Sequence, residues 1–348
     1  MRVGSARAVA ARWVLRHACQ EDGFRGAYFS GSTVGLPDDA ELPVASDVDV
    51  VVVTAADEAP LKLGKFVYLD TLLEITYLPW RQLASAEEVL GSYHLAGSFR
   101  VDTIIADPTG RLRRLQAQVS RHFAERAWVQ RRCENARQRI IDRLRAIDTG
   151  AAWHEQVLAW LFPTGVTTHV LLVAALRNPT VRLRYLAARD VLDDYGHADL
   201  YPELLTLLGC VALRPARVAR HLGELARTFD AAAAAAKTPF VFSTDITPAA
   251  RPIAIEGSRA LINAGHHREA VFWIVATFAR CHTILAADAP PELQRALAPG
   301  FDAILADLGI PSPTALLRRA EDVTEFLPRL WETTGAILSA NTGITIRS

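Results

Sequence analysis

The sequence has few cysteines and no excess of charge of either sign. Only four of its 348 residues are cysteine, and no two of them form a Cys-x-x-Cys pair. The chain therefore shows no zinc motif and fits a reducing compartment. Lys and Arg together number 38, as do Asp and Glu. The basic excess that is typical of dedicated nucleic-acid binders is missing, which disfavours nucleic acid as a partner.

Long apolar runs are also missing. No segment reaches the roughly 18 to 20 consecutive apolar residues that a membrane span needs. The first twenty residues contain Arg2, Arg7, Arg12 and Arg16, which interrupt any apolar stretch. This segment is therefore predicted to be a helix and not a signal peptide. We expect a soluble, cytoplasmic protein without membrane contact.

The chain is long enough for two domains, and its patterns change at about residue 111. A helix is expected at 5–20, and strands at 26–30, 47–54, 71–78 and 101–106. After these strands the patterns are helical, and helices are expected on either side of the break at Pro163. The predicted fold is α+β. A mixed α/β domain is expected at 1–112, followed by a larger all-helical domain at 113–348.

Three acidic residues stand where buried strands are expected. Asp47 and Asp49 are two apart at the head of a valine-rich strand, so their side chains share one face. Carboxylates this close stay ionised most easily when a cation lies between them, and Mg²⁺ is the usual cation where phosphates also bind. Glu74 lies inside the apolar strand 71–78 and is costly to bury without a partner. If the two strands are neighbours, the three carboxylates converge.

Gly31 and Ser32 end the strand that precedes these acids. A glycine at a strand end lets the backbone approach a ligand closely, and the following N–H groups and the Ser hydroxyl can bind an anion. A phosphate-binding turn next to an acidic triad is the arrangement of two-metal phosphoryl transfer.

Together these features resemble the DNA polymerase beta-like nucleotidyltransferase superfamily. The superfamily pattern hG[GS], Dh[DE]h and a later h[DE]h is matched in order by 29–32, 47–50 and 73–75. The segment 106–112 is similar to the end of the catalytic domain in small bacterial members. The resemblance covers about residues 10–115. The helical part of the chain that follows is similar in layout to kanamycin-type antibiotic nucleotidyltransferases, although no motif matches there.

The resemblance implies a nucleotidyltransferase that uses Mg²⁺ and a nucleoside triphosphate such as ATP. Asp47 and Asp49 would bind two metal ions and Glu74 one of them, while Gly31 and Ser32 would hold the triphosphate. An acceptor hydroxyl would then attack the α-phosphate, and pyrophosphate would leave. Glu74, or a carboxylate of the helical domain, would help to deprotonate that hydroxyl.

The neutral charge and the large helical domain favour a small hydroxylated acceptor, either antibiotic-like or a biosynthetic intermediate. Transfer to a protein or to a tRNA end is one alternative, and a non-catalytic nucleotide-binding protein is another. Kanamycin-type enzymes build a shared site from two subunits, so a homodimer is compatible with the resemblance. No residue requires one, and neither the acceptor nor the triphosphate can be named from the sequence.

Each acidic residue also has a purely structural interpretation. Asp47 and Asp49 could cap an exposed strand edge, and Glu74 could pair with Arg81 or Lys65. Asp70 and Asp102 are the other candidates for the third carboxylate. Candidates for a general base are Glu125, Glu134 and Glu155. The adjacent His266 and His267 are candidate metal ligands. The three glutamates are expected on solvated helix faces, and the histidines at a helix start with Glu269 in its first turn.

Overall fold

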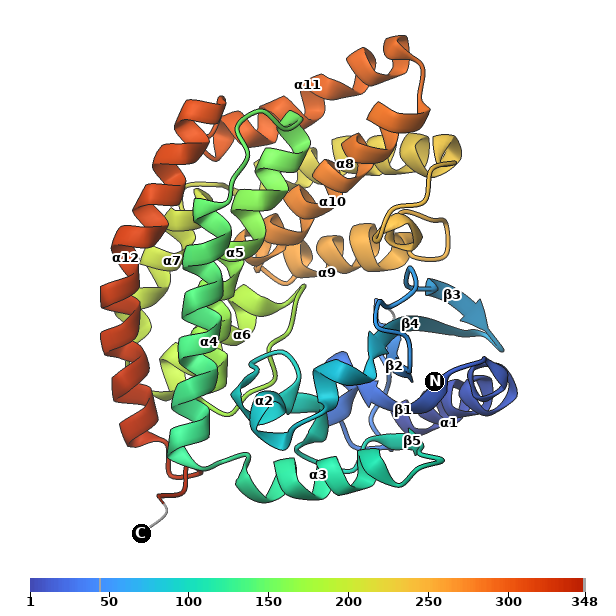
Figure 1. Ribbon diagram of the computed structural model, residues 1–348. Coiled ribbons are helices and arrows are strands. Elements are labelled where there is room, and N and C mark those ends of the chain that lie inside the picture. Colours follow the sequence, from blue (N-terminus) through green and yellow to red (C-terminus); the bar gives the residue numbers. More distant parts are fainter. Residues whose placement is uncertain (44, 347–348) are drawn as a thin grey trace. The chain divides into compact units, whose positions relative to one another are not determined.

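The computed structural model describes residues 1–43 and 45–346 (Figure 1). The structure is α+β, as the sequence predicts, and divides into two compact units. The first unit comprises Met1–Arg132, Leu176–Pro179 and the C-terminal residues from Thr342. The second comprises Cys133–Ala175 and Thr180–Asn341.

A mixed five-stranded sheet forms the first unit. The strands are β1 (Phe24–Ser30), β2 (Val48–Thr54), β3 (Gly64–Tyr68), β4 (Thr71–Pro79) and β5 (Ile104–Ala106). Their order is β3-β4-β2-β1-β5 (Figure 1). The pair β2 and β4 is parallel, and the other neighbours are antiparallel. Four of these strands were expected, and β3 was not.

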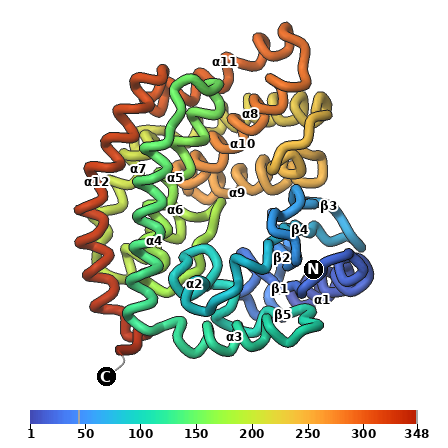
Figure 2. The backbone as a smooth tube through the Cα atoms, in the orientation of Figure 1, coloured from blue at the N-terminus to red at the C-terminus, as the bar shows by residue number. Residues whose placement is uncertain are grey.

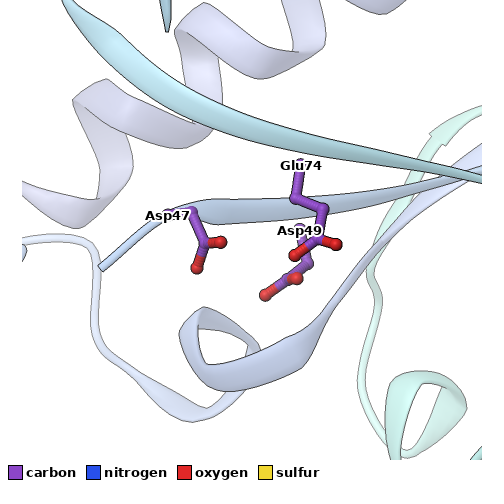
Figure 3. Close-up of side chains that lie close together, drawn as sticks. All are labelled: Asp47, Asp49 and Glu74. Carbon is purple, nitrogen blue, oxygen red and sulfur yellow. The ribbon is translucent and has the colours of Figure 1, made fainter. Parts of the chain in front are cut away.

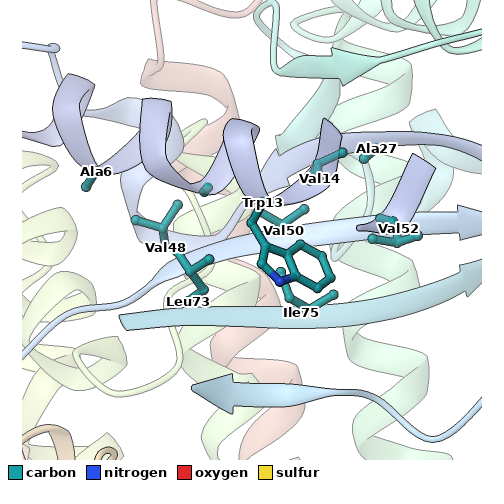
Figure 4. Close-up of a cluster of buried hydrophobic side chains, with 11 residues drawn as sticks. Ala6, Trp13, Val14, Ala27, Val48, Val50, Val52, Leu73 and Ile75 are labelled. Atoms are coloured by element: carbon teal, nitrogen blue, oxygen red, sulfur yellow. The ribbon is translucent and has the colours of Figure 1, made fainter. Parts of the chain in front are cut away.

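Helix α1 (Val3–Arg16) covers one face of the sheet. Its Trp13 and Val14 pack against alternate residues of the two parallel strands (Figure 4). On β2 these residues include Val48 and Val50, which are almost completely buried. Because side chains alternate along a strand, this packing leaves Asp49 on the opposite face.

The opposite face is covered by α2 (Ala86–Gly91) and α3 (Arg111–His122). The α3 residues Leu112, Leu115 and Val119 share a buried cluster with Tyr28 and Val53 of the sheet. The boundary predicted at residue 112 falls at the start of this helix. Since the apolar side of α3 belongs to the core of the sheet, the first unit extends to Arg132.

Helices form the second unit among the described residues, and Figure 2 traces their backbone. They are α4 (Arg126–Arg145, from Cys133 on), α5 (Trp153–Ala174), α6 (Arg184–Asp194), α7 (Tyr201–Leu208), α8 (Pro215–Ala235), α9 (Gly257–Asn263), α10 (His267–Asp288), α11 (Pro291–Asp307) and α12 (Pro313–Ala340). Two of them, α5 and α10, are long and apolar enough to cross a membrane. The apolar windows of these two helices are 83% and 78% buried inside the protein, as in core helices.

The expected break at Pro163 is wrong, because α5 continues through it. Proline removes one backbone hydrogen bond from a helix. Here the residues from Pro163 to Ala174 are all buried, and the hydroxyl of Thr164 donates to the carbonyl of Trp160 at 2.8 Å. Tertiary packing therefore outweighs the local preference.

Candidate metal and phosphate site

The strands that carry the predicted acidic residues lie side by side and run in the same direction. Asp49 on β2 is the register partner of Glu74 on β4, and Asp47 directly precedes β2. Carboxylate oxygens of the three residues lie within 4.8 Å of one another (Figure 3). The convergence expected for neighbouring strands is therefore present, and we call these three residues the carboxylate cluster.

The cluster belongs to a row of polar side chains that crosses four strands. Ser30 of β1 is paired with Asp49, Asp49 with Glu74, and Glu74 with Lys65 of β3. Directly paired residues of neighbouring strands project from the same face of a sheet. The sheet thus places a hydroxyl, two carboxylates and an ammonium group in one line across four strands.

Two lysines supply positive charge to the carboxylate cluster. The Lys65 Nζ lies 2.8 Å from an Asp47 oxygen and also donates to Glu74. The Lys62 Nζ donates to the other Glu74 oxygen at 2.6 Å. The structural pairing of Glu74 with Lys65 is thus present, whereas Arg81 is exposed. The Lys65 side chain is only 7% exposed, so a largely buried cation already bridges Asp47 and Glu74.

The electrostatics of the two strand carboxylates differ. Burial raises the pKa of Asp49 well above its usual value, and the charges of Asp47 and Glu74 raise it further. Burial would also raise the pKa of Glu74, but Lys65 and Lys62 outweigh it and lower this pKa to about 2. Asp49 is thus the carboxylate that gains most from an additional cation.

Gly31 lies directly against Asp49. Its backbone has φ +68°, in the left-handed region, and a Cβ placed on it would lie 1.8 Å from the Asp49 Oδ2. Only glycine fits there. A short 3₁₀ turn over Gly31–Gly35 follows, with Ser32 exposed. We call this segment the glycine turn; its open backbone borders the carboxylate cluster.

Side chains from distant segments hold the glycine turn in place. Arg7 of α1 donates to the carbonyls of Thr33 and Leu36, the latter at 3.1 Å, and to Asp38 at 2.8 Å. The amide of Asn178 donates to the carbonyl of Gly31 at 2.8 Å. These bonds fix the shape of the turn without a ligand.

The rival third carboxylates lie outside the cluster. Asp70 is exposed in the turn between β3 and β4. Asp102 is also exposed; it accepts a hydrogen bond from the backbone of Ile104 and lies 3.5 Å from Arg113. Glu74 is therefore the third acidic member.

The other candidate residues have structural surroundings. Glu125 lies 2.7 Å from His122, Glu134 is exposed on α4, and Glu155 accepts a hydrogen bond from the backbone of Ala152 at the start of α5. No general base follows from these positions.

The two adjacent histidines also have structural contacts, and the His266 Nδ1 lies 3.4 Å from an Arg189 nitrogen. His267 begins α10, as expected, and its ring bonds to the carbonyl of Leu213. Glu269 is buried between Arg189 at 3.0 Å and Tyr201 at 2.8 Å.

Several residues around the site were missed from the sequence, and Lys65 was considered only as a structural partner of Glu74. For the lysines a signal exists, since the chain has only three and two of them, Lys62 and Lys65, precede the Glu74 strand by a few residues. No local pattern marks Arg100 or Asn178, because tertiary contacts alone bring them to the glycine turn.

The donor set of the site consists of oxygen atoms. Three carboxylate groups suit a hard divalent cation, and the lysines show that the site already accepts positive charge. The adjacent backbone of the glycine turn suits an anion. Comparison of the sequence with protein-family models and with curated proteins gives no match.

Proposed function

We propose that this protein is a metal-dependent nucleotidyltransferase that moves a nucleoside monophosphate from a nucleoside triphosphate to a hydroxyl group and releases pyrophosphate. The observation that carries the proposal is the parallel pairing of Asp49 with Glu74, with Gly31 packed against Asp49. The sheet thereby combines three carboxylates with a backbone turn suited to phosphate. The resemblance to the polymerase beta-like superfamily supports the same reaction.

The residues present fit a Mg²⁺ site. Asp47 and Asp49 would hold two ions and Glu74 one of them. When bound, these ions neutralise phosphate charge and lower the pKa of the attacking hydroxyl. Lys65 and Lys62 would have to give up their carboxylate contacts, and the glycine turn would bind the phosphates through its N–H groups.

A small hydroxylated molecule is the proposed acceptor. The balanced charge of the chain offers no general attraction to a polynucleotide. The large helical unit, which the reaction centre does not require, is the part of the protein to which we assign the acceptor.

The test is pyrophosphate release in the presence of Mg²⁺, each of the four nucleoside triphosphates and a panel of hydroxylated acceptors. We expect acceptor-dependent release, reduced at least about a thousandfold by Asp49→Asn, because the charge that holds the metal ions is removed. Asp70→Asn, an equivalent change at an exposed carboxylate outside the cluster, should retain full activity. Full activity of both Asp47→Asn and Asp49→Asn would refute the site.

The lysine contacts favour a second candidate function. A carboxylate cluster that is neutralised by Lys62 and Lys65 is stable without metal, as a protein that only binds nucleotide would require. Such a protein would bind a triphosphate without releasing pyrophosphate and would tolerate Asp49→Asn. The assay above, combined with calorimetric nucleotide binding, distinguishes the two functions.

A further inference from the structure

The glycine turn has a guanidinium group at its far end. Arg100 directly follows the 3₁₀ turn Ala96–Phe99. Its Nη2 lies 2.9 Å from the position that a Cβ on Gly35 would take, so it contacts the last residue of the glycine turn. Its Nη1 donates to the carbonyl of Leu176 at 3.2 Å. Within the described part of the chain, this is the only hydrogen bond of Arg100, and no carboxylate pairs with it.

The absence of an anionic partner sets Arg100 apart from the other cations at the site. Arg7 lies against the same turn but has Asp38 as well as two carbonyls. Lys65 has Asp47 and Glu74. Arg100 is partly buried, and burial lowers the pKa of its guanidinium. A charge in such surroundings is unfavourable unless an opposite charge accompanies it.

The segment that carries Arg100 is bonded to the strand that leads into the glycine turn. The Ser98 hydroxyl donates to the Ser30 hydroxyl at 3.1 Å, and the backbone of Phe29 donates to the carbonyl of Thr103 at 2.9 Å. The Thr103 hydroxyl in turn donates to the carbonyl of Ser98 at 2.7 Å. Arg100 is therefore held at a fixed place relative to the turn.

The segment Leu176–Pro179, which belongs to the first unit, contacts both sides of this arrangement. The carbonyl of Leu176 orients Arg100, and the amide of Asn178 holds the carbonyl of Gly31. The Asn178 Oδ1 lies 3.0 Å from the position of a Cβ on Gly97, so its side chain fills the space between the two glycines. One short segment thus orients a cation at one end of the glycine turn and the backbone at the other.

We propose that Arg100 binds the phosphate groups of a ligand at the glycine turn, and that Asn178 is a positioning residue that fixes Gly31 against Asp49. The ligand class is an inorganic or nucleoside polyphosphate. This inference rests on the proposed function and adds to it the residue that recognises the phosphate chain. A guanidinium presents a planar fork of donors to phosphate oxygens, which a lysine cannot reproduce.

The experiment is calorimetric binding of tripolyphosphate, and of a non-hydrolysable nucleoside triphosphate, to the full-length protein in the presence of Mg²⁺. Arg100→Gln should weaken both affinities about 10- to 100-fold, the range of a lost charge-assisted hydrogen bond. Arg100→Lys should weaken them less. Arg113→Gln is the matched control, because Arg113 is 60% exposed and lies in the same unit; it should bind like the wild type.

A metal titration separates Arg100 from Asn178. In Mn²⁺ binding without nucleotide, followed by electron paramagnetic resonance, Arg100→Gln should retain wild-type affinity. Asn178→Ala should lose affinity for Mn²⁺ and for tripolyphosphate, because Gly31 is no longer held against Asp49. A merely structural role of Asn178 would lower the melting temperature and leave both affinities unchanged.

The outcomes also separate this inference from the proposed function. A wild type that binds neither polyphosphate contradicts both. If Arg100→Gln and Asn178→Ala are folded and bind the polyphosphates with the same affinity as the wild type, the inference is overturned. The proposed function then still stands.

Discussion

At the level of single residues, the backbone conformation of Gly31 and the position of the Asp49 carboxylate depend on each other. The left-handed backbone of Gly31 disfavours a side chain, and a Cβ at this position would collide with the Asp49 carboxylate. A larger residue would have to move either the glycine turn or the carboxylate. The geometry of the proposed phosphate site and that of the metal site are therefore coupled through one position.

Gly31→Ala should lower the affinity for Mn²⁺ about 10- to 100-fold, the range seen when groups that orient metal ligands are changed. Titration followed by electron paramagnetic resonance measures it. Gly196→Ala is the matched control, because Gly196 has a similar φ of +74° but no atom within 4 Å of an added Cβ. It should cost about 1–2 kcal/mol of stability from backbone strain and leave Mn²⁺ affinity unchanged. Equal Mn²⁺ affinities of wild type and Gly31→Ala would refute the coupling.

At this scale, the sequence predicted the convergence of Asp47, Asp49 and Glu74, because acids inside apolar strands stand out against their neighbours. It did not predict Asn178, which reaches Gly31 over a separation of 147 residues. Nothing near Asn178 in the sequence reflects that contact. Lys65 was weighed only as a structural partner for Glu74, since the strand that carries it was not expected, and Lys62 was not considered.

Strand β3 is the strand of the sheet that the sequence did not predict, and its connection to β4 explains why. It is joined to β4 by the two-residue turn Leu69–Asp70, in which both residues have positive φ. Such turns normally contain glycine or asparagine, and these residues are the usual sequence signal of a hairpin. With leucine in this place the signal is missing, although the register brings Lys65 opposite Glu74.

Removing the ammonium group of Lys65 on β3 should make the stability of the first unit depend on bound metal. Lys65→Met leaves Asp47 and Glu74 without their shared partner and should cost on the order of 3 kcal/mol of stability in the absence of metal. Added Mn²⁺ should restore more stability to this variant than to the wild type. Thermal unfolding with and without Mn²⁺ measures both effects. Lys237→Met, at an exposed lysine, should change neither, and an equal Mn²⁺ effect in Lys65→Met and wild type would contradict the prediction.

The contact between α8 and α11 in the second unit should make the stability of the protein depend on pH. Asp307 accepts hydrogen bonds from Arg217 and lies 2.7 Å from the ring of His221. These contacts, first of all the hydrogen bond from Arg217, lower the pKa of Asp307. The stabilisation is therefore present above the usual carboxylate pKa of about 3.9 and is lost as the pH falls through the lower, folded value.

Asp307→Asn should accordingly destabilise the protein at neutral pH, and the difference from wild type should shrink as the pH falls below about 3.9, where the carboxylate becomes protonated. Urea unfolding over this pH range measures it. Asp199→Asn at an exposed ion pair with Arg329 is the control, with an expected effect of about 0–1 kcal/mol. A difference between wild type and Asp307→Asn that grows as the pH falls below about 3.9 would contradict the sign of the shift.

At the scale of the whole molecule, the sequence predicted a sheet-containing part followed by a helical part. The position of the boundary was harder to predict, because α3 has an ordinary amphipathic pattern that does not say which core its apolar side joins. The inclusion of Leu176–Pro179 in the first unit could not be predicted either. Both depend on contacts between residues far apart in the sequence.

Because each unit has its own core, we expect two unfolding transitions in calorimetry. Mn²⁺ should raise the temperature of one transition only, since a ligand stabilises the unit that binds it. Asp307→Asn should lower the other. A single transition that responds to both changes would show that the units unfold together.

A crystal structure of the protein with Mn²⁺ and a non-hydrolysable nucleoside triphosphate tests the proposed site most directly. We predict anomalous density for manganese between Asp47, Asp49 and Glu74, the Lys65 ammonium group displaced from these carboxylates, and phosphates at the glycine turn. If saturating Mn²⁺ and nucleotide leave no manganese peak, and Lys65 still bridges Asp47 and Glu74, the cluster is an ion-pair network and not a catalytic metal site.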